Sequence, residues 1–214
     1  PRPVSNGMII TYFGKQFFKV QHGDTVLAFN PISKDSKSNK GSRFGSLVAF
    51  STTNHPDYNG FEMVSHGDTV PFEVKGPGDY EIKDIFIKGI MTETALGGKK
   101  YINTIYTLAL DNISLCFLGC VKNGSVDTAV LGQIESPDIL FVPVGNEDLM
   151  TPGEAYKLAV SLEPKLIIPM DYDEKSLKAF LKEGGQDKVA SIDKLTIKAK
   201  ELAGREGEIV VISS

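Results

Sequence analysis

The chain has 214 residues, of which 41% are hydrophobic and 23% are charged, and both fractions are ordinary for a globular protein. Lysine and arginine number 23 against 27 aspartate and glutamate residues, which gives a net charge of −4. These values exclude a collagen-like, coiled-coil or fully disordered chain, and they leave no basic surplus for general nucleic-acid binding. We expect a single domain over residues 8–214 and interpret residues 1–7 as a tag or a disordered N-terminus.

The expected location of the protein follows from its apolar runs and its cysteines. No apolar stretch approaches the roughly 18 residues that a membrane span needs, and the N-terminal residues lack the apolar core of a signal peptide. Cys116 and Cys120 lie four positions apart in one apolar run, and on an extended strand they would be roughly 13 Å apart, too far for a disulfide. We therefore expect a cytoplasmic protein with no membrane or nucleic-acid partner.

Short apolar or alternating runs predict strands throughout the first half of the chain. Breaks that contain glycine, at residues 14–15 and 23–24, are typical of hairpin turns. The Ser-, Lys- and Gly-rich segment 33–46 predicts an exposed loop. The predicted strands are, in chain order, 8–13, 17–21, 25–29, 47–51, 70–74, 85–91, 104–110 and 113–118.

The second half alternates between predicted strands and helices. Thr151, Pro152 and Glu154 form a capping-box pattern that predicts the start of a helix, and Asp173 is placed to cap another. Strands first and strand–helix units later indicate a mixed α/β domain of two packed sheets with helices outside. The remaining predicted elements are a short helix at 126–134 and strands at 139–144, 166–169, 195–198 and 208–212.

Three polar segments directly follow predicted strands, at residues 52–60, 119–120 and 170–173. Functional side chains of α/β folds gather in loops beyond the carboxyl ends of strands. Candidate site residues are therefore expected within these three loops.

The order of these segments resembles the metallo-β-lactamase superfamily, in particular the small bacterial hydrolases that include the sugar-acid lactonases. The resemblance extends from about residue 8 to residue 172 and implies an αββα sandwich of two mixed sheets. It is carried by the segments Met8-Ile-Ile-Thr-Tyr-Phe-Gly14, Asn30-Pro31, Gly76-Pro-Gly-Asp-Tyr-Glu-Ile82, Asn103-Thr-Ile-Tyr106 and Phe141-Val-Pro-Val-Gly145.

The family's metal-binding residues are mostly replaced at the positions that the resemblance aligns. Its first motif reads Thr-His-x-His-x-Asp-His, where this chain has Thr-Thr-Asn-His-Pro-Asp-Tyr over residues 52–58. His55 and Asp57 match that motif. The replacements are Thr53, Tyr58, Phe117 and Asp171 for histidines and Cys120 for the bridging aspartate.

A zinc site normally has three protein ligands plus water, and the one remaining histidine of the first site does not supply them. We expect a degenerate metal centre without a cofactor, in a protein that is not an active metallo-hydrolase but a binding or scaffold module. A homo-oligomer and a small polar ligand in the vestigial cleft of His55, Asp57 and Asp171 are both compatible with this. The alternative is a hydrolase of lactones or phosphoesters that holds one zinc or manganese ion through Asp57, Cys120 and Asp171, with His55 carrying protons.

Overall fold

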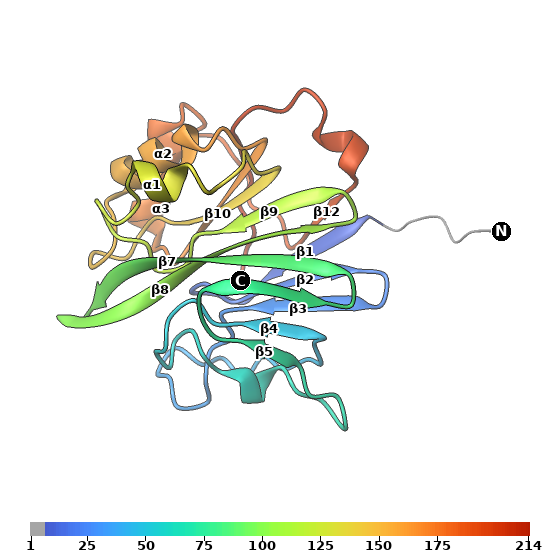
Figure 1. Ribbon diagram of the computed structural model, residues 1–214. Helices are drawn as coiled ribbons and strands as arrows, with labels where there is room; N and C mark the ends of the chain where they lie inside the picture. The colour runs from blue at the N-terminus through green and yellow to red at the C-terminus, as the bar shows by residue number, and fades with distance from the viewer. Residues whose placement is uncertain (1–6) are drawn as a thin grey trace.

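The computed structural model describes residues 7–214, and its strands form two mixed β-sheets packed face to face (Figure 1). This confirms the fold predicted from the strand patterns and from the family resemblance. The interpretation of residues 1–7 as a tag or disordered N-terminus lies outside the described residues, apart from Gly7. Among the described residues, the helices are all too short or too polar to cross a membrane.

The first sheet has six strands in the order β12-β1-β2-β3-β4-β5. Strands β12 to β3 pair antiparallel, whereas β3, β4 and β5 are parallel, so the sheet is mixed. Its strands are β1 (Met8–Tyr12), β2 (Phe18–His22), β3 (Thr25–Phe29), β4 (Val48–Phe50), β5 (Phe72–Val74) and β12 (Leu195–Ile197).

The second sheet has seven strands in the order β13-β11-β10-β9-β8-β7-β6. Strands β13 to β9 are parallel, and β9 to β6 form an antiparallel meander. Its strands are β6 (Gly78–Ile82), β7 (Ile85–Leu96), β8 (Lys99–Leu110), β9 (Ile113–Phe117), β10 (Ile139–Pro143), β11 (Leu166–Met170) and β13 (Glu208–Ile209).

Aromatic side chains fill the core between the two sheets. Phe29 stacks on Phe50 with ring centroids 4.5 Å apart and on Phe117 with centroids 4.9 Å apart. Phe141 of β10 lies edge-on to Phe18 of β2 at 5.0 Å. Because these rings are fully buried, or nearly so, they remove a large apolar area from water and hold the sheets together.

The α-helices pack on the outer face of the seven-stranded sheet (Figure 1). Ala155, Ala159 and Phe180 contribute to that layer. The predicted caps are confirmed, since Thr151 and Glu154 form a capping box and Asp173 accepts a bond from Ser176 N. The helices are α1 (Thr128–Leu131), α2 (Pro152–Ser161) and α3 (Glu174–Glu183), with 3₁₀ turns at Phe61–Met63 and Ala199–Leu202.

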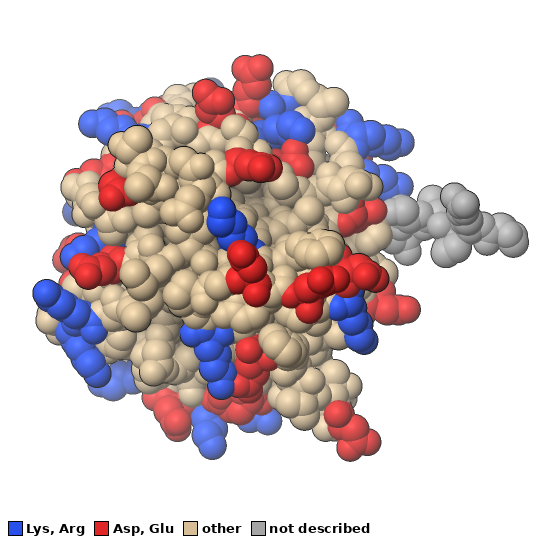
Figure 2. Space-filling model, viewed as in Figure 1, with Lys and Arg blue, Asp and Glu red and all other residues tan. Residues whose placement is uncertain are grey.

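Loop segments cover the outer face of the six-stranded sheet. Ile32, Phe44 and Val64 come from the connections around β4 and pack there with Phe17 and Ala49. On the face of the molecule that Figure 2 shows, the described lysine and arginine side chains are interspersed with acidic ones. The charges are therefore mixed over this view rather than gathered by sign.

The hairpin of β7 and β8 is longer than the sequence patterns predict. Strands were expected at 85–91 and 104–110, but pairing continues to Leu96 and Lys99. Gly97 and Gly98, both with positive φ, make the tight turn. The strand β6 was not predicted as a separate element, and the predicted helix at 126–134 is the single turn of α1. The longer hairpin extends over the side of the cleft described next.

Candidate functional site

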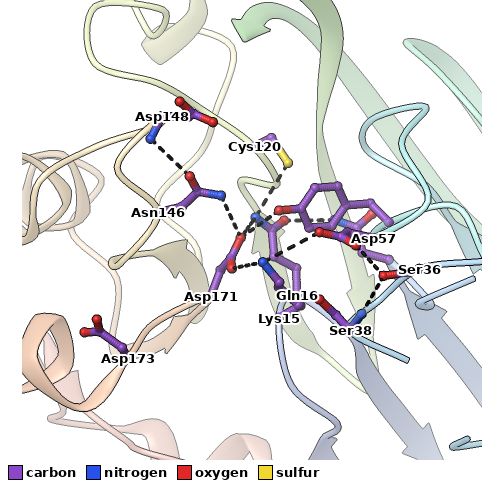
Figure 3. Close-up of polar contacts among 12 residues, drawn as sticks. Lys15, Gln16, Ser36, Ser38, Asp57, Cys120, Asn146, Asp148, Asp171 and Asp173 are labelled. Carbon is purple, nitrogen blue, oxygen red and sulfur yellow. Dashed lines mark hydrogen bonds and ion pairs between the residues drawn. The ribbon is translucent and has the colours of Figure 1, made fainter. Parts of the chain in front are cut away.

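Asp57, Cys120 and Asp171, three of the four predicted site residues, gather at one edge of the two sheets (Figure 3). The loops after β4, β9, β10 and β11 all begin at the carboxyl ends of parallel strands, which meet at the same edge. The turn between β1 and β2 reaches the same place. This arrangement brings residues from five separate stretches of the chain into contact.

Asp171 is the centre of the polar contacts in Figure 3. It is 6% exposed and stands directly after β11 with φ of 52°. Its Oδ2 accepts hydrogen bonds from the Tyr58 hydroxyl at 2.8 Å and from Gln16 Nε2 at 3.2 Å. Asn146 Nδ2 adds a longer bond of 3.5 Å. These donors and one ammonium surround the buried carboxylate.

That ammonium belongs to Lys15. Its Nζ lies 3.5 Å from Asp171 Oδ1 and 3.6 Å from Asp57 Oδ2, so it bridges the two carboxylates. Burial alone would lower the pKa of the Lys15 ammonium, but the charges of Asp171 and Asp57 outweigh that effect and raise the pKa. Lys15 is therefore a fixed positive charge between two negative ones.

Asp57 and His55 are held within the loop after β4. The Ser36 hydroxyl donates a short hydrogen bond to Asp57 Oδ1. The backbone N–H of Asp57 donates to His55 Nδ1 at 3.2 Å. The His55 ring lies against Tyr58 and Tyr101, with centroids 5.8 Å and 5.9 Å away. His55 thus has one ring nitrogen occupied by the loop itself.

Cys120 follows β9 and is fully buried beside the carboxylates. Gln16 Nε2 donates to its sulfur at 3.6 Å. Burial is the main reason that the pKa of the Cys120 thiol rises to about 12. In the metal-free protein the group at this position is consequently a neutral thiol at neutral pH.

Two buried asparagine side chains hold the residues next to Asp171 in place. Asn30 Nδ2 donates to Gln16 Oε1 at 2.9 Å and to Thr52 Oγ1 at 2.8 Å. Asn103 Oδ1 accepts the Cys120 N–H at 2.7 Å. Because both asparagines are fully buried and bonded, they fix the positions of Gln16 and Cys120.

The three residues that stand in place of aligned histidines before residue 120 have different surroundings. Thr53 Oγ1 donates to Asn103 Oδ1 at 3.3 Å. Tyr58 is 1% exposed and donates to Asp171, and its burial raises the pKa of its hydroxyl, so it remains a phenol. Phe117 points into the aromatic core between the sheets. These side chains serve internal contacts.

The residues present do not fit the metal pair that the family resemblance implies. Within residues 7–214, no group of three or more His, Cys, Asp and Glu side chains is placed to hold a metal ion. Asp57 and Asp171 both face the Lys15 ammonium, and the Cys120 sulfur accepts a hydrogen bond from Gln16. The structure therefore brings Asp57, Cys120 and Asp171 to one edge as partners of Lys15 and Gln16.

A cleft of about 780 Å³ opens over these residues. His55, the hairpin tip at Gly97 and the loop around Asn146 all line it. Its ionisable lining has more negative than positive charge. The carboxylates are Asp57, Glu147, Asp148, Asp171 and Asp173, and the lysines are Lys15 and Lys40.

Lys15 and Gln16 were missed as site residues by the sequence patterns. Gly14 and Lys15 predicted only a hairpin turn, and that turn is present with both residues at positive φ. A φ of 52° is unusual for a lysine, because residues other than Gly, Asn and Asp rarely adopt this backbone conformation. That strain is visible only in the backbone, so the sequence carried no signal for it.

Comparisons with known proteins agree with this fold. The model of the family described as the beta-lactamase superfamily domain matches residues 9–171. A proposed Zn-dependent hydrolase of the metallo-β-lactamase superfamily from Thermotoga maritima superimposes with a TM-score of 0.75 and 25% identity, over 96% of this chain and 98% of that one. A proposed metal-dependent hydrolase from Parabacteroides distasonis gives a TM-score of 0.67 at 16% identity, over 96% and 92% of the two chains.

A curated relative matches over a short segment only. A protein named metal-dependent hydrolase from Methanopyrus kandleri is 35% identical over 48 residues, which are 22% of this chain and 21% of that protein. The match thus spans about a fifth of the relative's length.

Proposed function

The chain belongs to the metallo-β-lactamase superfamily. Within this family we propose that it is a metal-independent member, which binds a small polar ligand in its cleft without hydrolysing it. One observation carries the proposal: the polar side chains at the aligned metal positions are bonded to other parts of the protein. Asp57 and Asp171 face Lys15, Cys120 contacts Gln16, and Thr53 contacts Asn103. The cleft above them remains open.

The lining of the cleft favours one class of ligand. Five carboxylates against two lysines repel an anion, whereas hydroxyl or amine groups can bond to carboxylate and amide oxygens. Tyr12, Phe13 and Tyr172 supply apolar area on one side. A neutral polyol or a small amine fits this combination of a few polar groups and aromatic surface.

Metal content tests the metal-independent part of the proposal. The protein is purified without a His-tag or chelator and measured by elemental mass spectrometry. We expect less than about 0.1 equivalents of any transition metal, even after incubation with excess zinc or manganese. One equivalent that disappears in the Asp57→Ala variant would overturn the proposal.

Ligand binding is tested by thermal shift with neutral polyols, amines and carboxylic acids. A ligand at about 100 times its Kd stabilises the native state by roughly 2.7 kcal/mol. We expect stabilisation by members of the first two classes, weakened in the cleft variant His55→Ala. The control is His66→Ala in the turn before β5, outside the cleft lining. A panel without any shift contradicts the ligand-binding part.

A hydrolase with one metal ion is the second candidate, because the relatives named above are described as metal-dependent hydrolases. Its ligands would be Asp57, Cys120 and Asp171, with His55 as proton carrier. It requires that Asp57→Ala and Cys120→Ala both abolish a metal-dependent hydrolysis of lactones or phosphoesters. Unchanged turnover in both variants would exclude it.

A further inference from the structure

Lys15 is fixed at the floor of the cleft by its backbone as well as by its charge. Its carbonyl oxygen accepts the N–H of Asp171 at 2.6 Å and the hydroxyl of Tyr12 at 2.7 Å. The same residue adopts φ of 52°, a backbone conformation that residues other than Gly, Asn and Asp rarely take. The two hydrogen bonds fix the backbone from which the Lys15 side chain extends.

The two carboxylates need a positive charge at this point. Asp171 is 6% exposed and Asp57 about one fifth exposed, and both turn an oxygen toward the same Nζ. A buried carboxylate without a partner is costly, and two that share a site repel each other. Lys40, the other lysine of the cleft, contacts Ser214 Oγ at 3.4 Å instead. Lys15 is therefore the cation that both carboxylates use.

We propose that the Lys15 ammonium takes the charge-compensating place of a divalent cation between Asp57 and Asp171, and that its positive charge opposes the binding of a metal ion there. The inference rests on the proposed function and extends it. Once the ammonium is removed, Asp57 and Asp171 lose the positive charge that they share, and Gln16 still connects Asp171 to the Cys120 thiol. Oxygen ligands of this kind suit manganese, and sulfur and imidazole suit zinc.

The test compares Lys15→Met with Lys40→Met as the matched control, because both remove a lysine from the lining of one cleft. Each metal-free protein is titrated with Mn²⁺ and with Zn²⁺ by calorimetry. We expect Lys15→Met to bind at least one of the ions about tenfold or more tightly than the wild type. Lys40→Met should match the wild type. Equal affinities in all three proteins would overturn the inference.

The outcomes also separate this inference from the proposed function. A wild type that binds a stoichiometric metal ion contradicts both. A wild type and a Lys15→Met variant that both remain free of metal contradict the inference alone, because metal-independent ligand binding in the cleft does not depend on why metals are absent.

A second comparison covers the case in which Lys15→Met folds poorly. The double variant Lys15→Met/Asp57→Asn removes one of the two facing carboxylates and with it the repulsion. We expect its melting temperature to lie above that of Lys15→Met. Lys15→Arg, which keeps a cation, should also melt higher than Lys15→Met. If neither change raises the melting temperature, the missing charge is not the cause and the inference fails.

Discussion

Asn103 shows how a single buried side chain positions the end of a strand. Its amide takes part in four hydrogen bonds, with Thr53 Oγ1, Thr92 Oγ1, Leu118 O and the Cys120 N–H. Loss of such an amide leaves several buried polar groups unpaired, each at a cost of about 1–3 kcal/mol. The backbone of residues 118–120 is therefore fixed by a residue of the neighbouring strand β8.

The two thiols give a prediction at the scale of single residues. Burial raises the pKa of Cys116 and of Cys120 to about 12, and the neutral thiol reacts poorly. At about pH 8 the native protein should not react with a disulfide reagent such as DTNB on the timescale of minutes. In the denatured chain both thiols should react, which consumes two equivalents of the reagent.

A fast-reacting thiol in the native protein would contradict this picture of Cys120. The variant Cys116→Ser separates the two groups, since any remaining reaction then belongs to Cys120. Wild type in denaturant serves as the control that both thiols are free.

The residues of the candidate site could be predicted only in part from the sequence. His55, Asp57, Cys120 and Asp171 follow predicted strands, so their approach to one edge follows from the topology. The partners of these residues cannot be deduced from the topology, because Gln16 and Asp171 are 155 positions apart and meet only in the folded chain. The turn that carries Lys15 was predicted, but its contacts with Asp57 and Asp171 form only in the folded chain.

At the scale of elements, the strands and helix caps could be predicted because the sequence patterns that indicate them are local. Alternating or apolar runs gave most strands, and Thr151, Pro152 and Glu154 marked the start of α2. The far half of the β7–β8 hairpin was missed because its buried face carries the polar residues Thr92, Thr94 and Asn103, so apolar residues do not alternate with polar ones there. The pairing of the two strands depends on Gly97 and Gly98 and on the partner strand.

The tip of this hairpin is tied to the loop after β10. The Gly97 N–H donates to Asp148 Oδ2 at 2.7 Å, and both residues line the cleft. We expect Asp148→Ala to speed hydrogen exchange at the Gly97 amide, because that N–H then has only water as its partner. The free energy of unfolding should change by no more than about 0.5 kcal/mol, since the contact is exposed.

Glu147→Ala is the matched control, because Glu147 is the neighbouring carboxylate of the same loop and also lines the cleft. Its removal should leave exchange at Gly97 unchanged. Equal protection of Gly97 in the wild type and in Asp148→Ala would show that the bond does not hold the hairpin tip.

At the scale of the whole molecule, Asp138 connects three parallel strands at the end opposite the cleft. It precedes β10 and accepts hydrogen bonds from Ser114 N at 2.8 Å and from Lys165 Nζ at 2.6 Å. Burial alone would raise the pKa of the Asp138 carboxyl, but the bonds from Lys165 and Ser114 lower it on balance. The ionised form is therefore favoured by the native state.

This shift predicts a dependence of stability on pH. A carboxyl with a lowered pKa stabilises the fold above its unfolded pKa of about 3.9, and this contribution disappears as the pH falls through the native value. Asp138→Asn should therefore be less stable than the wild type at neutral pH in urea denaturation, and the difference should shrink below about pH 4. Asp24→Asn, in the exposed turn between β2 and β3, serves as the control. A difference that stays constant with pH would contradict the assignment.

The outermost strands of the seven-stranded sheet bear on how copies of this chain can meet. An unpaired strand is a template for another chain, and natural proteins protect such strands with charge or by keeping them short. Asp79 and Glu81 are exposed on β6, and β13 has only two residues. Like charges at one border and a short strand at the other disfavour the extension of this sheet into a second molecule.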